Sequence, residues 1–485
     1  AGYLARNGYR VTVIEKNSWV GGRARVLQRD GFRFDMGPSW YWMPAEHDRW
    51  FLDMGVERSS YYELRRVEPS YKVYFGDSEP GEERNVVTVP SDLDRARSLF
   101  ESYEPGAGRK LEEYLEACRK KYDLAMTNFI YKNYDSLFDF INLRTVANLR
   151  TLNILRSYKG LVHSYFRHPY LRKILEFPVV FLGSSARKTP AVYTLMNHID
   201  FVLGTWYPSG GFGRVVESMM EVDRSLGVEF RFNTPVRRLE IEGGKVTGIV
   251  CGSDHDEDRI SADLVVANAD YHHVESELLP PEGRSFSEES WEKRALAPGV
   301  LNFYVGLDTK VDRFAHHTFF FDSDWEAHFK AVYEEPGWLE KPLFYIHVPS
   351  ITDPSSAPEG KEAVFILIPV APGLVDDEEK RQRYFDDALG RIESLTGEAF
   401  RKHIRFVESY SLTEFQRDYN AFKGNAFGLG QTLFQTAYFR TANRSKKLAN
   451  LYYSGHYTVP GTGTTMSTIS GNVVTKRIVD EHPPD

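Results

Sequence analysis

The sequence predicts an α/β protein in which a nucleotide-binding sheet is interrupted by a second domain of sheet and helices. The apolar run Val11–Ile14 ends in Glu15, as expected for a buried parallel strand with a carboxylate at its C-terminal edge. Near the other end, the strand-like run 451–456 leads through a glycine-rich loop into a helical pattern at Met466–Val479. Four strand-like runs within 301–369 indicate a separate, antiparallel sheet.

Length and composition limit the possible classes of protein. The 485 residues suggest two or three domains with a large core. A net charge of −8 argues against a nucleic-acid-binding protein. The two cysteines, Cys118 and Cys251, cannot form a disulfide framework, which indicates a reducing compartment. No apolar run approaches the roughly 20 residues that a spanning helix needs, so we expect a soluble or peripheral chain.

The start of the sequence indicates an N-terminal truncation. Ala1–Asn7 has helix-forming composition, and Gly8 is placed to end that helix. In a dinucleotide-binding βαβ unit, the acidic residue that binds a ribose hydroxyl follows a glycine-rich pyrophosphate turn by about 20 residues. Counting back that far from Glu15 passes Ala1, and the sequence does not begin with Met. We therefore expect the first strand and its glycine turn to precede Ala1.

A glycine-rich motif follows the first strand. Gly21, Gly22 and Arg23 are followed by the turn Asp35-Met36-Gly37-Pro38-Ser39. A glycine pair lets the backbone approach a phosphate closely, and an arginine supplies fixed positive charge. The alternative is a surface turn beside a salt-bridged arginine. The strand ending in Glu15 together with both motifs favours a nucleotide site.

The middle of the chain supplies the rest of the predicted nucleotide-binding sheet. A glycine-rich turn at Tyr207–Gly213 opens a helical pattern. After it come a strand, a meander through the Gly243-Gly244 hairpin, and a buried returning strand. These elements span 214–226, 227–232, 234–241, 245–251 and 262–269.

One long segment stands out by its charge. Phe140–Lys173 contains seven Lys or Arg residues and no Asp or Glu, interleaved with Leu and aromatic residues. A basic helix of this composition is typical of an interfacial membrane element. The alternative is a solvated basic face opposite a core-facing one.

No motif indicates a metal. His316 and His317 are adjacent in a predicted strand, where neighbouring side chains point to opposite faces, so they should not bind one ion together. The metalloprotease, zinc-ribbon and P-loop motifs H-E-x-x-H, C-x-x-C and G-K-[ST] do not occur. We expect no metal site.

With both ends considered, the chain resembles the bacterial-type phytoene desaturases, which are flavin-dependent carotenoid desaturases of the amine oxidase superfamily. Two departures are the missing glycine fingerprint and Gly463-Thr464-Thr465-Met466, where the family more often carries Gly/Pro-rich residues; the second leaves the exact substrate open. The matching motifs are Glu15–Arg23, Phe34–Ser39, Tyr207–Gly213, Asn268–Asp270, Ala315–Thr318, Asp353–Gly360, Gly424–Phe427, Phe439–Asn443 and Gly455–Gly463.

The resemblance implies an FAD-binding Rossmann-like domain of the GR2 type (1–68, 208–284 and 437–485) with an inserted α+β substrate domain (69–207 and 285–436). Val236 would place its backbone against the adenine, which is compatible with its being a strand core residue. The C-terminal loop would direct backbone N–H groups and a helix dipole at the flavin, unless it is an ordinary β–α turn. The implied cofactor-binding residues are Glu15, Gly21, Gly22, Arg23, Gly37, Pro38, Ser39, Val236, Gly455, Gly461, Gly463 and Met466.

The implied activity is oxidative desaturation of a carotenoid precursor, from phytoene to lycopene-type products. Desaturation removes a hydride and a proton from neighbouring carbons, and the flavin accepts the hydride. The substrate would dissolve in a membrane, so we expect peripheral attachment through Phe140–Lys173 on the cytoplasmic side. Arg156 is a candidate catalytic cation near the flavin; otherwise it belongs to the membrane-facing basic set. The alternatives are a carotenoid isomerase or polyene saturase, an amine oxidase, and a flavin-free lipid-binding remnant.

Overall fold

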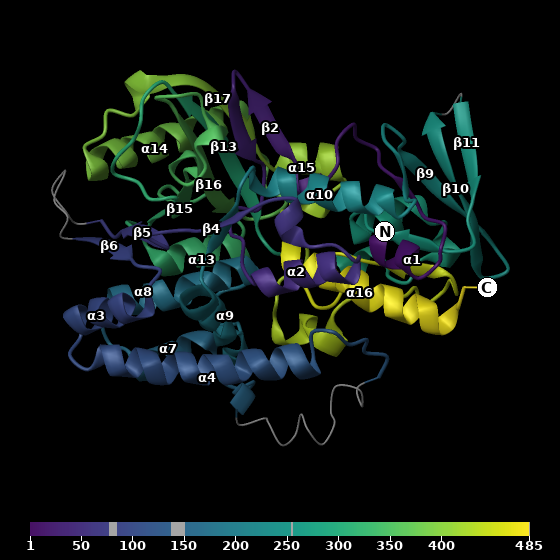
Figure 1. The fold of residues 1–485 in the computed structure, drawn as a ribbon, viewed down its shortest axis with the longest axis horizontal. Helices are drawn as coiled ribbons and strands as arrows, with labels where there is room; N and C mark the ends of the chain where they lie inside the picture. The colour runs from purple at the N-terminus through teal and green to yellow at the C-terminus, as the bar shows by residue number, and fades with distance from the viewer. Residues whose placement is uncertain (77–84, 137–150, 254–255, 485) are drawn as a thin grey trace.

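The computed structural model describes residues 1–76, 85–136, 151–253 and 256–484 (Figure 1). As predicted, helix α1 (Gly2–Arg6) precedes strand β1 (Thr12–Ile14), with Gly8 at a φ of +91° between them. Strand β1 pairs in parallel with β8 (Glu229–Arg231). The start and the middle of the sequence therefore share one sheet.

A second parallel pair joins the middle of the chain to its end. Strand β12 (Val265–Ala267) pairs with β18 (Leu451–Tyr453), which confirms both predicted strands. The predicted helices are α10 (Gly211–Ser225) and α16 (Thr464–Glu481). Helices α1 and α2 (Pro44–Asp53) both pack against α16 (Figure 1). The predicted Gly243-Gly244 hairpin joins β9 (Val236–Glu242) to β10 (Lys245–Ser253), and β11 (Asp256–Ser261), which was not predicted, completes that antiparallel sheet.

The second domain is built on a seven-stranded sheet in the order β17-β13-β16-β15-β14-β5-β6. Its neighbours are antiparallel except for the parallel pair β14–β5, which joins the early part of the chain to the predicted sheet. Strand β17 was not predicted. The strands are β5 (Tyr71–Tyr74), β6 (Val86–Val89), β13 (Gly299–Leu307), β14 (His317–Phe320), β15 (Phe344–His347), β16 (Glu362–Val370) and β17 (Ile404–Tyr410).

Helices cover both faces of this sheet (Figure 1). Alternate residues of β13 face opposite sides: Leu301 and Phe303 pack in the same cluster as residues of α14 (Glu378–Thr396), whereas Val300 and Tyr304 pack in the cluster that contains residues of α4 (Ala107–Asn128). The remaining helices on the α4 side include α3 (Leu93–Tyr103), α7 (Tyr158–Tyr165), α8 (Pro169–Glu176), α9 (Leu195–His198) and α13 (Trp325–Tyr333). The shorter elements are β2 (Val26–Arg29), β3 (Phe32–Asp35), β4 (Leu64–Arg66), β7 (Trp206–Pro208), α11 (Tyr271–His273), α12 (Glu288–Glu292) and α15 (Leu412–Tyr419).

The basic segment is not one helix. Its first part, up to residue 150, lies outside the described residues. Most of the remainder lies in α7 and α8, which are separate because Pro169 occupies the first position of α8 and the chain is extended at Phe166. The predicted single basic helix is therefore wrong over the described part of this segment.

Candidate active site

Three motifs that lie far apart in the sequence meet around Arg23. The Nη1 atom of Arg23 lies 3.2 Å from Nε2 of His456, and its Nη2 donates to the carbonyl oxygen of Asn425 at 3.3 Å. The carboxylate of Asp270 is 3.9 Å from the same Nη2. Burial and the Arg23 charge hold the pKa of His456 well below its usual value, so its neutral ring accepts from the guanidinium. Sequence reasoning gave no role to Asp270 or His456 beyond membership of matching motifs.

One hydrogen-bond donor of Arg23 has no acceptor among the described residues. Its Nε is buried and has no hydrogen-bond partner. A buried N–H without an acceptor costs about 1–3 kcal/mol, which indicates a missing anionic or polar group at this position.

The glycines beside Arg23 are required by the local geometry. Gly21 and Gly22 have φ of +95° and +52°, and nothing lies within 4 Å of a Cβ added to Gly22, so a ligand can approach its backbone. A Cβ on Gly37 would lie 2.4 Å from the carbonyl oxygen of Arg23. The two glycine motifs are therefore packed backbone to backbone.

Asp35 connects this motif to helix α10. Its carboxylate accepts from the backbone N–H of Gly213 at 3.1 Å and from the hydroxyl of Tyr207 at 2.9 Å. Burial raises its pKa, and the hydrogen bonds from the start of α10 oppose that shift. The turn Asp35–Ser39 is thereby fixed to a helix N-terminus, a role that the sequence motif did not reveal.

The C-terminal loop has the predicted form of a glycine loop before a helix. Gly461 and Gly463 have φ of +138° and +118°, and α16 begins directly after Gly463. Buried Arg440 holds this loop by donating to the carbonyl oxygens of Thr458, at 2.9 Å, and His456. Burial lowers the pKa of Arg440 to about 10, so the guanidinium remains charged at neutral pH. No sequence pattern distinguishes Arg440 from a surface arginine.

The turn at Gly37–Ser39 and the C-terminal glycine loop open onto one cavity of about 400 Å³, a size typical of small-molecule sites. Five of the predicted cofactor residues line it, namely Gly37, Pro38, Ser39, Gly463 and Met466. The rest of the wall is mainly aromatic and aliphatic, and it includes Trp40, Trp42, Phe177, Phe181, Phe319, Phe321, Trp325 and Phe329.

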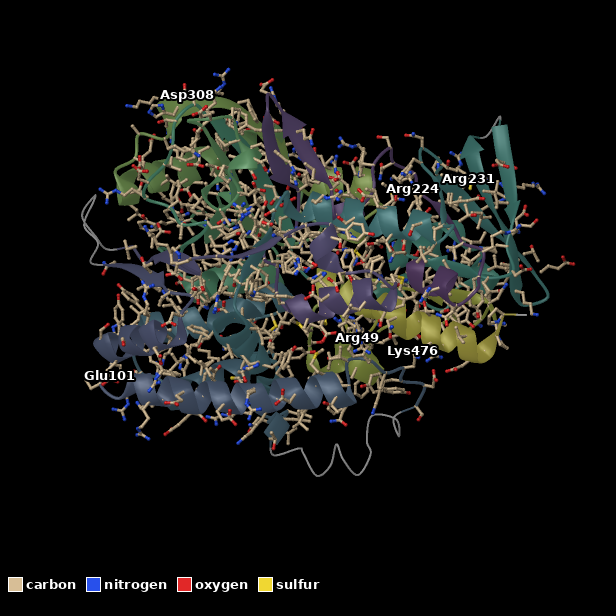
Figure 2. The ribbon with its side chains drawn as sticks, in the orientation of Figure 1. Arg49, Glu101, Arg224, Arg231, Asp308 and Lys476 are labelled. Carbon is tan, nitrogen blue, oxygen red and sulfur yellow. The ribbon has the colours of Figure 1, made fainter. Side chains whose placement is uncertain are left out.

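The described wall of the cavity carries no ionised side chain. Among the described residues that line it there is no Asp, Glu, Lys or Arg. Its one histidine, His328, is neutral because burial lowers its pKa to about 3. Charged side chains such as Glu101 and Asp308 instead lie on the outer surface (Figure 2). A cavity of this kind favours an uncharged, apolar ligand.

The other predicted cofactor residues lie outside the cavity wall. Glu15 follows β1, and its carbonyl oxygen accepts from the N–H of Thr234 at 2.9 Å, two residues before Val236. Glu15 and Val236 therefore lie near the same sheet edge. Gly455 donates from its N–H to the hydroxyl of Ser470, at 3.0 Å. No contact in the structure tests whether these residues bind a cofactor, so their assignment stays a prediction.

Arg156 lies on the surface and is absent from the cavity wall. It is exposed, and its Nη2 donates to the carbonyl oxygen of Gly160 at 2.7 Å. Its catalytic role stays a prediction that this geometry does not support.

The sequence argument about His316 and His317 is wrong. Strand β14 begins only at His317, and just before it Ala315 donates from its N–H to the hydroxyl of Thr318 at 3.0 Å. This turn breaks the alternation of side chains, and the two imidazole rings lie 4.5 Å apart. His347 joins them, and one nitrogen from each of the three rings lies within 4.8 Å of the others.

Comparison with known proteins places the chain in a family. Residues 1–479 match the flavin containing amine oxidoreductase family. A carotenoid 3,4-desaturase of Haloarcula japonica is 39% identical over 480 residues, which cover 99% of this chain and 95% of the relative. A zeta-carotene-forming phytoene desaturase of Myxococcus xanthus is 31% identical, and the match covers 99% of this chain and 91% of the relative. The chain belongs to the flavin-containing amine oxidoreductase family.

Solved structures agree with this fold. An oxidoreductase from Methanosarcina mazei aligns with a TM-score of 0.64 at 14% identity, covering 99% of this chain and 96% of that one. Cyclohexylamine oxidase from Brevibacterium oxydans aligns with a TM-score of 0.57 at 14% identity, with the same coverage. The predicted fold class and family resemblance are confirmed. The unpartnered Nε of Arg23 and the open space at Gly22 fit a flavin nucleotide.

Proposed function

We propose that this protein is an FAD-dependent desaturase of long carotenoid hydrocarbons in carotenoid biosynthesis. The observation that carries the proposal is the aromatic cavity whose described lining residues are uncharged and whose wall includes Gly37–Ser39 and the C-terminal glycine loop. A hydrocarbon offers no hydrogen-bonding group, so its binding free energy comes from apolar burial, about 0.8 kcal/mol for each buried CH₂. The relatives named for carotenoid and phytoene desaturation support the same conclusion.

The residues of the chain have separable tasks in this reaction. When bound, FAD would supply the acceptor for the hydride removed from the substrate. Arg23 would neutralise negative charge on the cofactor, and the start of α16 would present the positive end of its dipole to it. The aromatic wall would exclude water and hold the polyene extended beside Gly37–Ser39.

An amine oxidase is the second candidate, and the site does not favour it. An amine substrate carries positive charge near neutral pH, and burying that charge without a partner is costly. Among the described lining residues no carboxylate is present to pair with it.

The assay is conversion of a carotenoid by FAD-supplemented protein in liposomes, read from visible absorbance and chromatography. Phytoene and an already conjugated carotenoid would be offered separately, because one relative is named for phytoene and another for carotenoids in general. We expect one of them to gain double bonds. Oxidation of simple amines without change to any carotenoid would overturn the proposal.

We propose further that the protein binds the membrane surface, on the cytoplasmic side, at the cavity mouth. No described helix is both long enough and apolar enough to cross a bilayer. Leu155 and Phe434 are 98% and 74% exposed, and the residues before them, Ile154 and Leu433, line the cavity. Phe439 lines the cavity too, and its ring lies 6.0 Å from that of Phe434. Exposed apolar side chains beside a lipid-binding cavity suit contact with acyl chains.

The charge contribution is smaller than the sequence suggests. Lys159, within the basic segment, pairs with Glu326 of α13, and nearby Arg187 and Lys188 both pair with Glu334. These carboxylates come from elsewhere in the chain and partly neutralise the basic surface. We therefore expect apolar insertion to contribute more to membrane binding than anionic lipid does.

Flotation with liposomes tests this proposal. The double variant Leu155→Glu/Phe434→Glu should float poorly and act slowly on liposomal substrate, while keeping activity on detergent-dispersed substrate. Val375→Glu is the matched control, because Val375 is 75% exposed and does not line the cavity. Equal flotation of both variants would remove these side chains from membrane binding.

A further inference from the structure

Three buried histidines converge behind the cavity wall. His317 and His347 face each other across the antiparallel pair β14–β15, and His316 joins them from the preceding turn. Nε2 of His316 and Nε2 of His347 are 3.0 Å apart. Each of the three side chains is at most 1% exposed.

The hydrogen bonds of this cluster are incomplete. Tyr345 donates its hydroxyl proton to Oγ of Ser39 at 3.0 Å. Nδ1 of His317 lies 2.6 Å from the same hydroxyl oxygen, which has no second proton to give, so Nδ1 carries the proton and donates it to Tyr345. Nε2 of His317 then carries a lone pair, and this atom is buried without a partner. Nδ1 of His316 is also buried without a partner. Unpartnered nitrogens on converging rings indicate a missing group.

We propose that His316, His317 and His347 bind a divalent transition-metal cation of the zinc type. Neutral imidazole nitrogens are preferred ligands of Zn²⁺, whereas Mg²⁺ and Ca²⁺ prefer oxygen ligands. Three histidines leave a fourth position for water or hydroxide, as in other three-histidine zinc sites. One nitrogen from each ring lies within 4.8 Å of the others, so a single cation can reach all three.

The surroundings supply compensating negative charge. The ring of Tyr207 lies 4.7 Å from that of His316, and its hydroxyl donates to the buried carboxylate of Asp35 at 2.9 Å. Asp353, which is 5% exposed, follows His347 by six residues. A buried cation needs such carboxylates nearby.

The site would act on the cavity through one hydrogen-bonded chain. Metal-binding histidines commonly donate their second N–H to a fixed acceptor, which orients the ring. Here the acceptor is Tyr345, which with Ser39 lines the cavity. The cation would therefore hold this part of the wall in place, as a structural metal rather than a reactant.

Metal content is the first test. Tag-free protein purified after growth with added Zn²⁺ should contain close to one zinc per chain by elemental analysis. The double variant His317→Gln/His347→Gln should contain none. His328→Gln is the control, because His328 is a buried histidine outside the cluster, and it should retain the zinc. Retention of zinc by the double variant would overturn the proposal.

Measurements on the native sequence cover the case in which the double variant does not fold. Zinc-edge X-ray absorption should show only nitrogen and oxygen neighbours, at about 2.0–2.1 Å. Tyr345→Phe should keep the stoichiometry but weaken zinc binding by about 10- to 100-fold in chelator competition. A sulfur neighbour, or native protein that neither contains zinc nor binds added Zn²⁺ after chelator treatment, would refute the site.

Discussion

Met196 offers a direct test of the uncharged cavity. It lines the wall, is half-buried, and has an unbranched side chain whose length Lys matches. Met196→Lys therefore adds an ammonium group with little change of shape, and the flexible stem allows the charge to reach water while the cavity is free of substrate. A hydrocarbon entering the cavity would strip that water from the ammonium.

The expected size follows from the cost of desolvation. An unpaired buried charge costs several kcal/mol, and the described wall offers no carboxylate to compensate it. A penalty of about 3 kcal/mol weakens substrate binding by roughly 100-fold. The assay is KM for liposomal carotenoid, together with flavin content and Tm, which should both stay close to the native values. Met196→Leu is the control and should bind substrate almost normally. Native-like KM in Met196→Lys would show that the hydrocarbon binds elsewhere.

Three further predictions concern the cofactor loops and the core. Glu15→Gln and Arg23→Ala should each weaken FAD binding by about 1.5–3 kcal/mol without unfolding the protein, and unchanged flavin titrations would remove both residues from the cofactor site. Gly37→Ala should lower Tm and flavin content because its Cβ would meet the Arg23 carbonyl, whereas Gly471→Ala, which has open space in α16, should not; equal Tm values would contradict this close packing. Burial raises the pKa of Asp200 to about 7, so its contribution to stability is complete below about pH 4 and is lost as pH rises through 7. From about pH 4 to pH 8 the native protein should therefore lose about 4 kcal/mol of unfolding free energy relative to Asp200→Asn, and parallel pH profiles in denaturant titrations would refute the shift.

Local patterns in the sequence were enough for many of the elements. The β-branched run at 86–89 and the apolar run at 301–307 form strands as predicted. The strand conformation of a short apolar run follows mainly from its own residue types, so it can be predicted locally. The Gly21-Gly22 turn and the C-terminal glycine loop also lie where their motifs predicted, since Gly21 and Gly463 have positive φ, a conformation that glycine adopts at little cost.

Contacts between segments that are distant in the sequence could not be predicted from such local patterns. The parallel pairing of β14 with β5 depends on which edge the chain reaches after some 240 intervening residues. The ion pair of Lys159 with Glu326, which makes the surface less basic than expected, also joins segments that are distant in the sequence. The contact of Asp35 with helix α10 could not be predicted either, because the sequence does not show that the N-terminus of α10 lies beside Asp35.

The histidine cluster shows how a local rule fails at an element boundary. The alternation of side chains holds only inside a strand, and His316 precedes β14. Applying the rule to His316, one residue outside the strand, therefore excluded a metal site that the structure makes plausible.

Anaerobic reduction of the bound flavin tests the central proposal most directly. FAD-loaded protein would be mixed without oxygen with a carotenoid in liposomes, and the flavin absorbance followed together with that of the polyene. We predict that the oxidised flavin band disappears in step with formation of one new double bond per flavin. Bleaching by an amine, with no bleaching by phytoene or by any conjugated carotenoid, would contradict the proposed function.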